Sequence, residues 1–189
     1  MARVAQTSET GLVVCVTGPE STGKTTLAEE LAEALDVPLV GEYARHYLEA
    51  RLTQGLEDYG EDDLLHIAKG QLAAEQQALA QGTGLVISDT DLQVVQIWWQ
   101  ERFGSPHPWL LDALAQRTPR RYLVMAPDLP WQADPLRESP DDRQRLFDCY
   151  LEVLRAGAHP FAEVFGSGRA RFERAMACVQ DWLVEPQFA

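Results

Sequence analysis

The sequence has few basic residues for its number of acidic ones. Its 16 Lys and Arg stand against 29 Asp and Glu, which gives a formal net charge of −13 at pH 7. A surface of this sign repels the phosphates of nucleic acids and of anionic membranes, and it tolerates a cationic small molecule. The alternative explanation is that the acidic charge only keeps the protein soluble. We therefore expect no nucleic-acid partner and no membrane partner.

Cysteines and long apolar runs are scarce as well. The three cysteines Cys15, Cys149 and Cys178 are far apart and form no Cys-x-x-Cys or Cys/His cluster. This spacing predicts small buried hydrophobic side chains in a reducing compartment, without disulfides or a zinc site. No stretch approaches the length of a membrane span, and Met1–Gly11 lacks the apolar core of a signal peptide. The expectation is a cytoplasmic protein.

What the chain does contain is an alternation of short apolar runs with helical patterns. Its 189 residues, 46% of them hydrophobic, suffice for one domain with a full core, predicted over residues 1–189. The alternation predicts an α/β fold with a five-stranded parallel sheet and helices on both faces. The predicted strands are Leu12–Thr17, Pro38–Gly41, Leu85–Ser88, Arg121–Ala126 and Phe161–Phe165; the predicted helices are Thr25–Leu35, Glu61–Gln81, Asp91–Glu101, Pro108–Arg117, Asp141–Ala156 and Ala170–Leu183.

The segment G-P-E-S-T-G-K-T, from Gly18 to Thr25, is the most informative motif. It joins a predicted strand to a predicted helix, as a phosphate-binding P-loop does, and a Gly-rich connection without function is the alternative. Lys24 is expected to reach the β- and γ-phosphates, and the Thr25 hydroxyl to ligate Mg²⁺. The motif thus predicts ATP and Mg²⁺ as cofactors. The predicted nucleotide-binding residues are Gly18, Glu20, Ser21, Thr22, Gly23, Lys24, Thr25 and Thr26.

Carboxylates end two of the predicted strands. Asp89 is the expected second Mg²⁺ ligand, and no glutamate follows it directly, which favours transfer to an acceptor over hydrolysis of ATP. Asp91 is a candidate acceptor ligand or a helix N-cap. Glu42 ends the second strand and should face the ligand crevice, where it suits the acceptor hydroxyl; a first-turn glutamate is the alternative. Which of Glu42, Asp89 and Asp91 acts as the base is left open.

Further candidates surround the expected acceptor. Arg45 suits an acceptor or phosphate oxygen, with a surface arginine as the alternative. The aromatic residues Tyr43, Tyr59 and Trp131 suit a flat, positively charged ring by stacking and cation–π attraction. Trp98 or Trp99 is expected to belong to the core.

The proline-rich stretch 127–143 follows the fourth predicted strand and is predicted to form a lid; a surface loop is the alternative. Arg137 lies in this loop and is expected to neutralise charge on the transferred phosphoryl group. Arg143, near the lid hinge, is assigned a supporting contact with the nucleotide. The late loop Gly166–Arg169 is a candidate adenine site or a plain turn.

Taken together, these residues resemble the ribosylnicotinamide kinase domain of the bacterial NadR-type NAD regulators. The matching segments, in the same order, are Gly18–Leu27, Glu42–Arg45, Ser88–Asp91, Pro130–Arg137, Asp142-Arg143 and Ser167–Ala175. The resemblance implies a three-layer P-loop fold of the nucleoside-kinase type with a closing lid. It also implies phosphorylation of the 5′-hydroxyl of nicotinamide riboside by ATP and Mg²⁺, which gives nicotinamide mononucleotide. The cationic ring of that substrate agrees with an acidic, aromatic acceptor region.

The resemblance leaves some properties of the family aside. Those regulators carry a DNA-binding segment and an adenylyltransferase domain ahead of the kinase, whereas this chain reaches its first predicted strand at Leu12. We therefore expect neither repression nor adenylyl transfer. Two alternatives stay open, namely a kinase for another nucleoside or a sugar, and a regulatory ATP-binding module. The sequence does not fix the oligomeric state.

Overall fold

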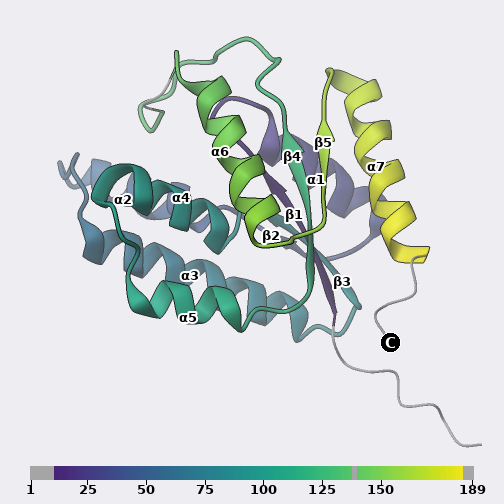
Figure 1. Ribbon diagram of the computed structural model, residues 1–189, viewed down its shortest axis with the longest axis horizontal. Coiled ribbons are helices and arrows are strands. Elements are labelled where there is room, and N and C mark those ends of the chain that lie inside the picture. The colour runs from purple at the N-terminus through teal and green to yellow at the C-terminus, as the bar shows by residue number, and fades with distance from the viewer. Residues whose placement is uncertain (1–10, 138–139, 185–189) are drawn as a thin grey trace, which may run out of the picture.

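The structure is a computed structural model that describes residues 11–137 and 140–184. The segment considered for a signal peptide and residues 138–139 of the predicted lid lie outside the described part, except for Gly11. In chain order the elements are β1 (Leu12–Thr17), α1 (Lys24–Leu35), β2 (Leu39–Val40), α2 (Tyr43–Thr53), α3 (Glu61–Leu79), β3 (Leu85–Asp89), α4 (Leu92–Phe103), α5 (Pro108–Ala115), β4 (Arg120–Met125), α6 (Arg143–Ala156), β5 (Phe161–Val164) and α7 (Gly168–Val184) (Figure 1). All predicted strands and helices are confirmed, each end within two residues.

The five strands form one parallel sheet in the order β2-β3-β1-β4-β5. Strands β1, β3 and β4 are buried along their whole length, as the continuous apolar runs of a doubly covered parallel sheet require. The carboxyl ends of parallel strands lie at the same edge of a sheet. The P-loop after β1, Glu42 after β2, Asp89 at the end of β3 and the loop after β4 are therefore brought together.

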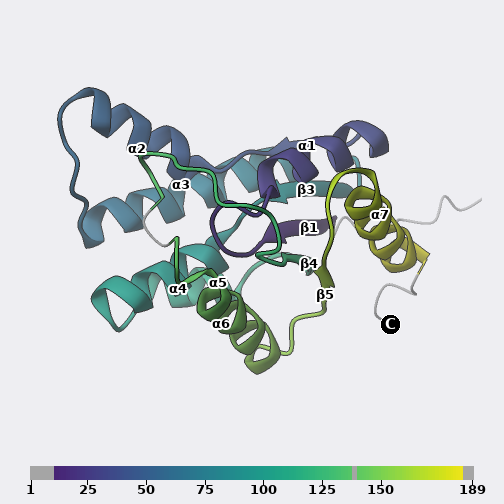
Figure 2. The same cartoon turned by 90° about the horizontal axis from the view of Figure 1, so that it is seen from above.

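Helices cover the sheet on both faces (Figure 2). On one face, Val14 and Val16 of β1 pack with Leu31 of α1 and Val179 of α7. On the other, Cys15 packs in the cluster that contains Phe147 of α6. Side chains alternate between the two faces of a strand, which explains why neighbouring β1 residues belong to different clusters. No helix in the described ranges has the length and hydrophobicity of a membrane span.

The predicted burial of cysteines and tryptophans is confirmed in part. Cys15 is fully buried, whereas Cys149 and Cys178 are only half-buried. All three are free thiols. Trp99 is fully buried in the core beside α3 and α5, while Trp98 belongs to the wall of a cavity described below.

Helix α2 is an element that the sequence analysis did not predict. None of its residues is fully buried, so its sequence lacks the continuous apolar stripe that reveals a packed helix. It nevertheless packs closely on α3, where a Cβ at Gly70 would come within 2.3 Å of the Tyr43 ring. Gly70 therefore permits the close approach of the two helices. Because Glu42 is the N-cap of α2, this packing determines where Glu42 stands.

Candidate active site

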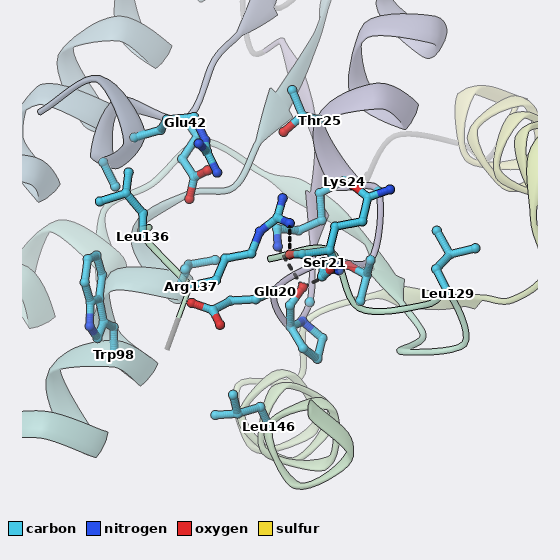
Figure 3. Close-up of a pocket in the computed structure, with 18 of the residues that line it drawn as sticks. Glu20, Ser21, Lys24, Thr25, Glu42, Trp98, Leu129, Leu136, Arg137 and Leu146 are labelled. Carbon is cyan, nitrogen blue, oxygen red and sulfur yellow. Dashed lines mark hydrogen bonds between the residues drawn. The ribbon is translucent and has the colours of Figure 1, made fainter. Parts of the chain in front are cut away.

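The carboxyl edge of the sheet opens into one large cavity with a volume of about 1010 Å³. The P-loop and the start of α1 line one side, and α2, α4, α6, α7 and the loops after α2 and β4 line the rest (Figure 3). Basic and acidic side chains line it in equal number. This corrects the expected acidic pocket, because α2, α4, α6 and α7 each add an arginine to Lys24 and Arg137 and so balance the carboxylates of the cavity.

The P-loop has the conformation of a phosphate cradle. Gly18 has a φ of 129° and lies so close to β4 that a Cβ would come within 2.8 Å of the Met125 carbonyl oxygen. Gly23, with a φ of 77°, is the left-handed N-cap of α1, so the helix N-terminus faces the loop. Lys24 Nζ donates to the Pro19 carbonyl at 2.8 Å, across the loop itself. The ammonium thus lies beside the concavity that would hold phosphates.

Thr25 and Asp89 form a buried oxygen pair beside that cradle. The Thr25 hydroxyl donates to Asp89 Oδ2 at 2.6 Å, and no group in the described residues donates to Asp89 Oδ1. Burial, and to a smaller extent the Glu42 carboxylate, raise the pKa of Asp89 to about 6, against the opposing effects of the Thr25 hydrogen bond and the Lys24 charge. A buried carboxylate oxygen without a donor is costly unless a cation meets it.

This donor set fits Mg²⁺, a hard cation that takes oxygen ligands. Within the described ranges, no cluster of three or more His, Cys, Asp or Glu side chains forms a metal site. Mg²⁺ commonly binds one or two protein oxygens together with substrate phosphates and water. Thr25 and Asp89 are thus suited to hold the ion jointly with a bound nucleotide.

Glu42 and Arg137 project into the middle of the cavity (Figure 3). Glu42 begins α2, and its charge is close enough to raise the pKa of Asp89, so the two carboxylates share one electrostatic environment. Arg137 Nη1 donates to the Gln132 carbonyl at 2.5 Å, which keeps the guanidinium within its own loop. The figure shows Arg137 between Glu42 and Lys24, where charge on a transferred group would develop.

The loop predicted as a lid is fastened to two walls of the cavity. Its Gln132 N–H donates to Ser21 Oγ at 2.8 Å, which joins it to the P-loop. Arg45 Nη1 of α2 lies 3.2 Å from Asp134 Oδ2, an ion pair that joins the loop to the opposite wall. The Leu136 N–H and the Arg45 charge together lower the pKa of Asp134. Arg45 is therefore engaged with this loop, although it also lines the cavity.

Arg143 and Trp131 lie beside the cavity and are not part of its wall. Arg143 Nη1 donates to the Leu129 carbonyl at 2.9 Å and to the Ser21 carbonyl at 3.4 Å. Its guanidinium is 5.8 Å from the centroid of the Trp131 ring. Arg143 therefore joins the loop after β4, at Leu129, to the P-loop, at Ser21, and the Trp131 ring lies near its guanidinium.

Asp91 does not reach the cavity, which corrects its assignment to the acceptor. It is 1% exposed, and its Oδ2 lies 2.5 Å from Arg117 Nη1 and 3.0 Å from Arg120 Nη1. Its Oδ1 accepts the Gln93 N–H at 2.8 Å, so the N-cap alternative holds. The arginines lower the pKa of Asp91 against the effect of burial. Asp91 is part of a buried ion cluster that anchors the start of α4.

Tyr43 also points away from the cavity, whereas Tyr59 lines it. The Tyr43 hydroxyl lies 3.1 Å from His66 Nε2 of α3, because the α2–α3 contact uses this ring. Tyr59 accepts a hydrogen bond from Trp98 Nε1 at 2.6 Å. The guanidinium of Arg102 lies 4.0 Å from the centroid of the Tyr59 ring. The aromatic wall therefore consists of Tyr59 and Trp98, and the Arg102 guanidinium already lies against the Tyr59 ring.

Arg171 of α7 is a site residue that the sequence analysis missed. It is 4% exposed and donates to the carbonyl of Thr22 in the P-loop and to the carboxylate of Asp128 at the start of the lid. Asp128 Oδ2 accepts the Gly166 N–H at 2.6 Å, so the same contact ties in the candidate adenine loop. The sequence did hold a signal of its burial: Arg171 is spaced at four-residue intervals from Ala175 and Val179, on the apolar face of α7.

Comparisons with known proteins agree with this architecture. A protein-family model described as an AAA domain matches residues 13–171. The trifunctional NAD biosynthesis/regulator proteins NadR of Salmonella typhimurium strain LT2 and of Escherichia coli K12 are each 26% identical over 175 residues. Each alignment covers 91% of this chain and 43% of the relative, so the chain spans less than half of these relatives. The resemblance seen in the motifs is confirmed.

Solved structures share the fold. A NadR protein in complex with NAD and AMP-PNP superposes with a TM-score of 0.77 at 23% identity, covering 95% of this chain and 52% of that one. A NadR protein in complex with NR gives 0.73 at 21% identity, with 95% and 53% covered. Deoxyadenosine kinase from M. mycoides gives 0.65 at 13% identity, with 89% and 99% covered. The predicted P-loop fold of the nucleoside-kinase type is thereby confirmed.

Proposed function

Since this chain belongs to the AAA-domain family, whose model covers most of it, we propose that it is an ATP-dependent kinase that phosphorylates the 5′-hydroxyl of nicotinamide riboside. The product is nicotinamide mononucleotide, and the reaction serves NAD salvage. The observation that carries the proposal is the single cavity in which a phosphate cradle, Thr25, Glu42 and Arg137 meet, with Asp89 bonded to Thr25 just behind the cavity wall. An enzyme that hydrolyses ATP needs room for only a water molecule beside the nucleotide, whereas this cavity also extends to Glu42 and to the aromatic wall of Tyr59 and Trp98.

The residues divide the work of transfer between them. Glu42 accepts the proton of the acceptor hydroxyl. The hydroxyl oxygen bonds to the γ-phosphorus of ATP as the bond from this phosphorus to the bridging β-phosphate oxygen breaks, which leaves ADP. Lys24 and Arg137 neutralise charge on the transferred group, and the lid excludes water. Bound through Thr25 and Asp89, Mg²⁺ supplies a positive charge to the phosphate oxygens.

The similar proteins support this choice of acceptor. The relatives are described as NAD biosynthesis/regulator proteins, and one solved NadR structure is described as a complex with NR. The aromatic wall suits a flat ring by stacking. The acceptor nevertheless stands as a proposal, because the chain spans less than half of those relatives.

One observation favours a second candidate, a kinase for a neutral nucleoside. The Arg102 guanidinium lies 4.0 Å from the Tyr59 ring centroid and pairs with Asp58 at 2.5 Å. A cation on this aromatic face repels a pyridinium and favours an uncharged base. Binding of nicotinamide riboside at Tyr59 requires Arg102 to swing away from the ring.

A coupled assay of ADP release separates these functions. The protein is given Mg²⁺ and ATP with nicotinamide riboside, with adenosine, cytidine or thymidine, or with no acceptor. Rapid release with nicotinamide riboside alone is the expected result. Release only with the neutral nucleosides favours the second candidate, and slow release that needs no acceptor favours a regulatory ATP-binding module.

Two variants verify that the release is catalysed at this site. Lys24→Ala should abolish transfer, because it removes the cation at the phosphates. Glu42→Gln should lower kcat by about two to four orders of magnitude and leave ATP binding intact, because the amide cannot accept the proton. Full turnover by Lys24→Ala would refute the mechanism.

A further inference from the structure

Helix α3 carries two buried polar side chains on a face that is otherwise apolar. Gln71 is 3% exposed and Glu75 is 4% exposed, one turn apart, and the same face buries Ile67 and Ala78. Glutamine and glutamate are rarely buried unless their polar atoms are bonded. Both residues make their bonds to segments that lead into the candidate active site.

Gln71 joins two of these segments through a single amide. Its Oε1 accepts the Tyr43 N–H at 2.8 Å, and its Nε2 donates to the Thr90 carbonyl at 3.4 Å. A backbone N–H can only donate and a carbonyl can only accept, so the partners fix the orientation of the amide. Tyr43 directly follows Glu42, and Thr90 directly follows Asp89. One side chain therefore connects the backbones next to the two carboxylates of the site.

The segment held at Thr90 is strained. Thr90 has a φ of 66°, in the left-handed region that a β-branched residue rarely adopts. Such a conformation persists only where surrounding contacts hold it. The Thr90 carbonyl also accepts from Ser88 Oγ at 2.6 Å, and its N–H donates to the Val16 carbonyl at 3.0 Å. Gln71 supplies the contact that comes from outside the sheet.

Glu75 holds the other end of the same segment through Arg120. The Glu75 oxygens lie 2.9 and 3.0 Å from the Arg120 nitrogens, and Arg120 Nη1 lies 3.0 Å from Asp91 Oδ2. Residues 89–91 are thus fixed from α3 at two points, one directly and one through an arginine. Gln71 differs from Glu75 in that its second bond goes to the start of α2, where Glu42 stands.

We propose that Gln71 is a positioning residue that sets the separation of the acceptor carboxylate Glu42 from the metal carboxylate Asp89. The role rests on the kinase function proposed above. An apolar side chain at this position leaves the Tyr43 N–H and the Thr90 carbonyl without their partner, so α2 and the end of β3 shift independently. Displacement of a catalytic group by about 1 Å can cost about 100-fold in rate.

The test compares Gln71→Met with Gln77→Met. The control has the same chemistry on the same helix but at an exposed position. ATP affinity measured in EDTA should equal that of the unchanged protein in both variants, because no bond to the P-loop is lost. The gain in ATP affinity on adding Mg²⁺ should fall about tenfold or more in Gln71→Met only. With acceptor present and with ATP and Mg²⁺ saturating, kcat should fall about 10- to 100-fold in Gln71→Met, whereas the KM for ATP with Mg²⁺ should rise only by as much as the Mg²⁺ gain is lost.

A double-mutant cycle tests the coupling to Glu42. The cycle is measured at saturating Mg²⁺, where weaker metal binding no longer limits the rate. If Gln71 then acts through Glu42, the kcat of Gln71→Met with Glu42→Gln should be close to that of Glu42→Gln alone. Effects that multiply would overturn the proposal, as would an unchanged Mg²⁺ gain in Gln71→Met. Gln71→Asn, whose shorter amide cannot span both partners, repeats the test if the methionine variant fails to bind ATP in EDTA.

The metal-binding measurement keeps the two proposals apart. If the unchanged protein phosphorylates no acceptor, the proposed function fails, while the Mg²⁺ gain still shows whether Gln71 positions Asp89. If the protein is an active kinase and Gln71→Met matches Gln77→Met in every measurement, the positioning role alone fails.

Discussion

Asp89 and Asp91 are two residues apart and differ completely in their surroundings. Asp89 keeps an oxygen without a donor, and burial raises its pKa to about 6. Asp91 faces Arg117 and Arg120, which lower its pKa. The S-D-T-D segment looks the same for either role, because both arginines come from later in the chain. The sequence alone therefore favoured a ligand role at both positions.

The buried cluster predicts a stability effect at Asp91. Asp91→Asn removes the carboxylate that pairs with the buried Arg117 and leaves Arg120 with Glu75 alone, so it should lower the free energy of unfolding by about 3 kcal/mol. Urea denaturation measures the loss, and Asp112→Asn, at an exposed position, is the control. A rise in the KM of the acceptor at unchanged stability would instead restore Asp91 to the substrate site.

The same cluster has a pH dependence of defined sign. The pKa of Asp91 is lowered in the folded protein, so its stabilisation is present above the unfolded value of 3.8 and is lost as the pH falls through the lower folded value. The difference in stability between the unchanged protein and Asp91→Asn should therefore be constant near neutral pH and shrink below about pH 4.

At the scale of elements, local sequence patterns predicted the strands and most helices. The apolar runs of β1, β3 and β4 are unambiguous because these strands are buried on both faces. Helix α2 was missed because it buries none of its residues completely and is held by its neighbour α3 and by the lid. Its contacts are tertiary, and no local periodicity records them.

The lid was predicted from its prolines and its position after β4, but its partners were not. The Arg45–Asp134 pair, the Gln132–Ser21 bond and the Arg171–Asp128 pair all join residues that are distant in the chain. Each partner is a common polar residue that on its own indicates only a surface position. Motif spacing located the cradle and the strand-end carboxylates because those depend on short, local geometry.

The lid carries a kinetic prediction at Arg137. Its guanidinium lies between Glu42 and Lys24 (Figure 3), so Arg137→Ala should lower kcat by about 100-fold or more if it stabilises charge in the transition state. Steady-state kinetics with ATP and the acceptor measure the effect. Arg174→Ala, at an exposed position of α7 that is absent from the cavity wall, should not change kcat. A change in KM alone would assign Arg137 to ground-state binding.

At the scale of the whole molecule, the site exists because the sheet is parallel. Four consecutive strand ends place a cradle, two carboxylates and the lid at one edge, although up to about a hundred residues separate them in sequence. The cluster below this edge, with Glu75, Asp91 and Arg120, fixes α3, α4 and β4 to one another. The α4 wall of the cavity is therefore fixed to the core, whereas the loop after β4 is fastened largely by exposed or half-buried contacts.

This arrangement predicts that nucleotide and Mg²⁺ stabilise the whole protein together. At a concentration 100 times the dissociation constant, a ligand of the folded state adds about 2.7 kcal/mol, or about 5–10 °C in Tm for a chain of this size. ATP with Mg²⁺ should produce such a shift in a thermal melt, and ATP in EDTA a smaller one. The metal-dependent part arises because Mg²⁺ relieves the buried, donorless charge of Asp89. Asp89→Asn should therefore retain the shift in EDTA and lose the additional shift with Mg²⁺, whereas Lys24→Ala should reduce both. An equal Mg²⁺ increment in Asp89→Asn and the unchanged protein would show that the ion is held elsewhere.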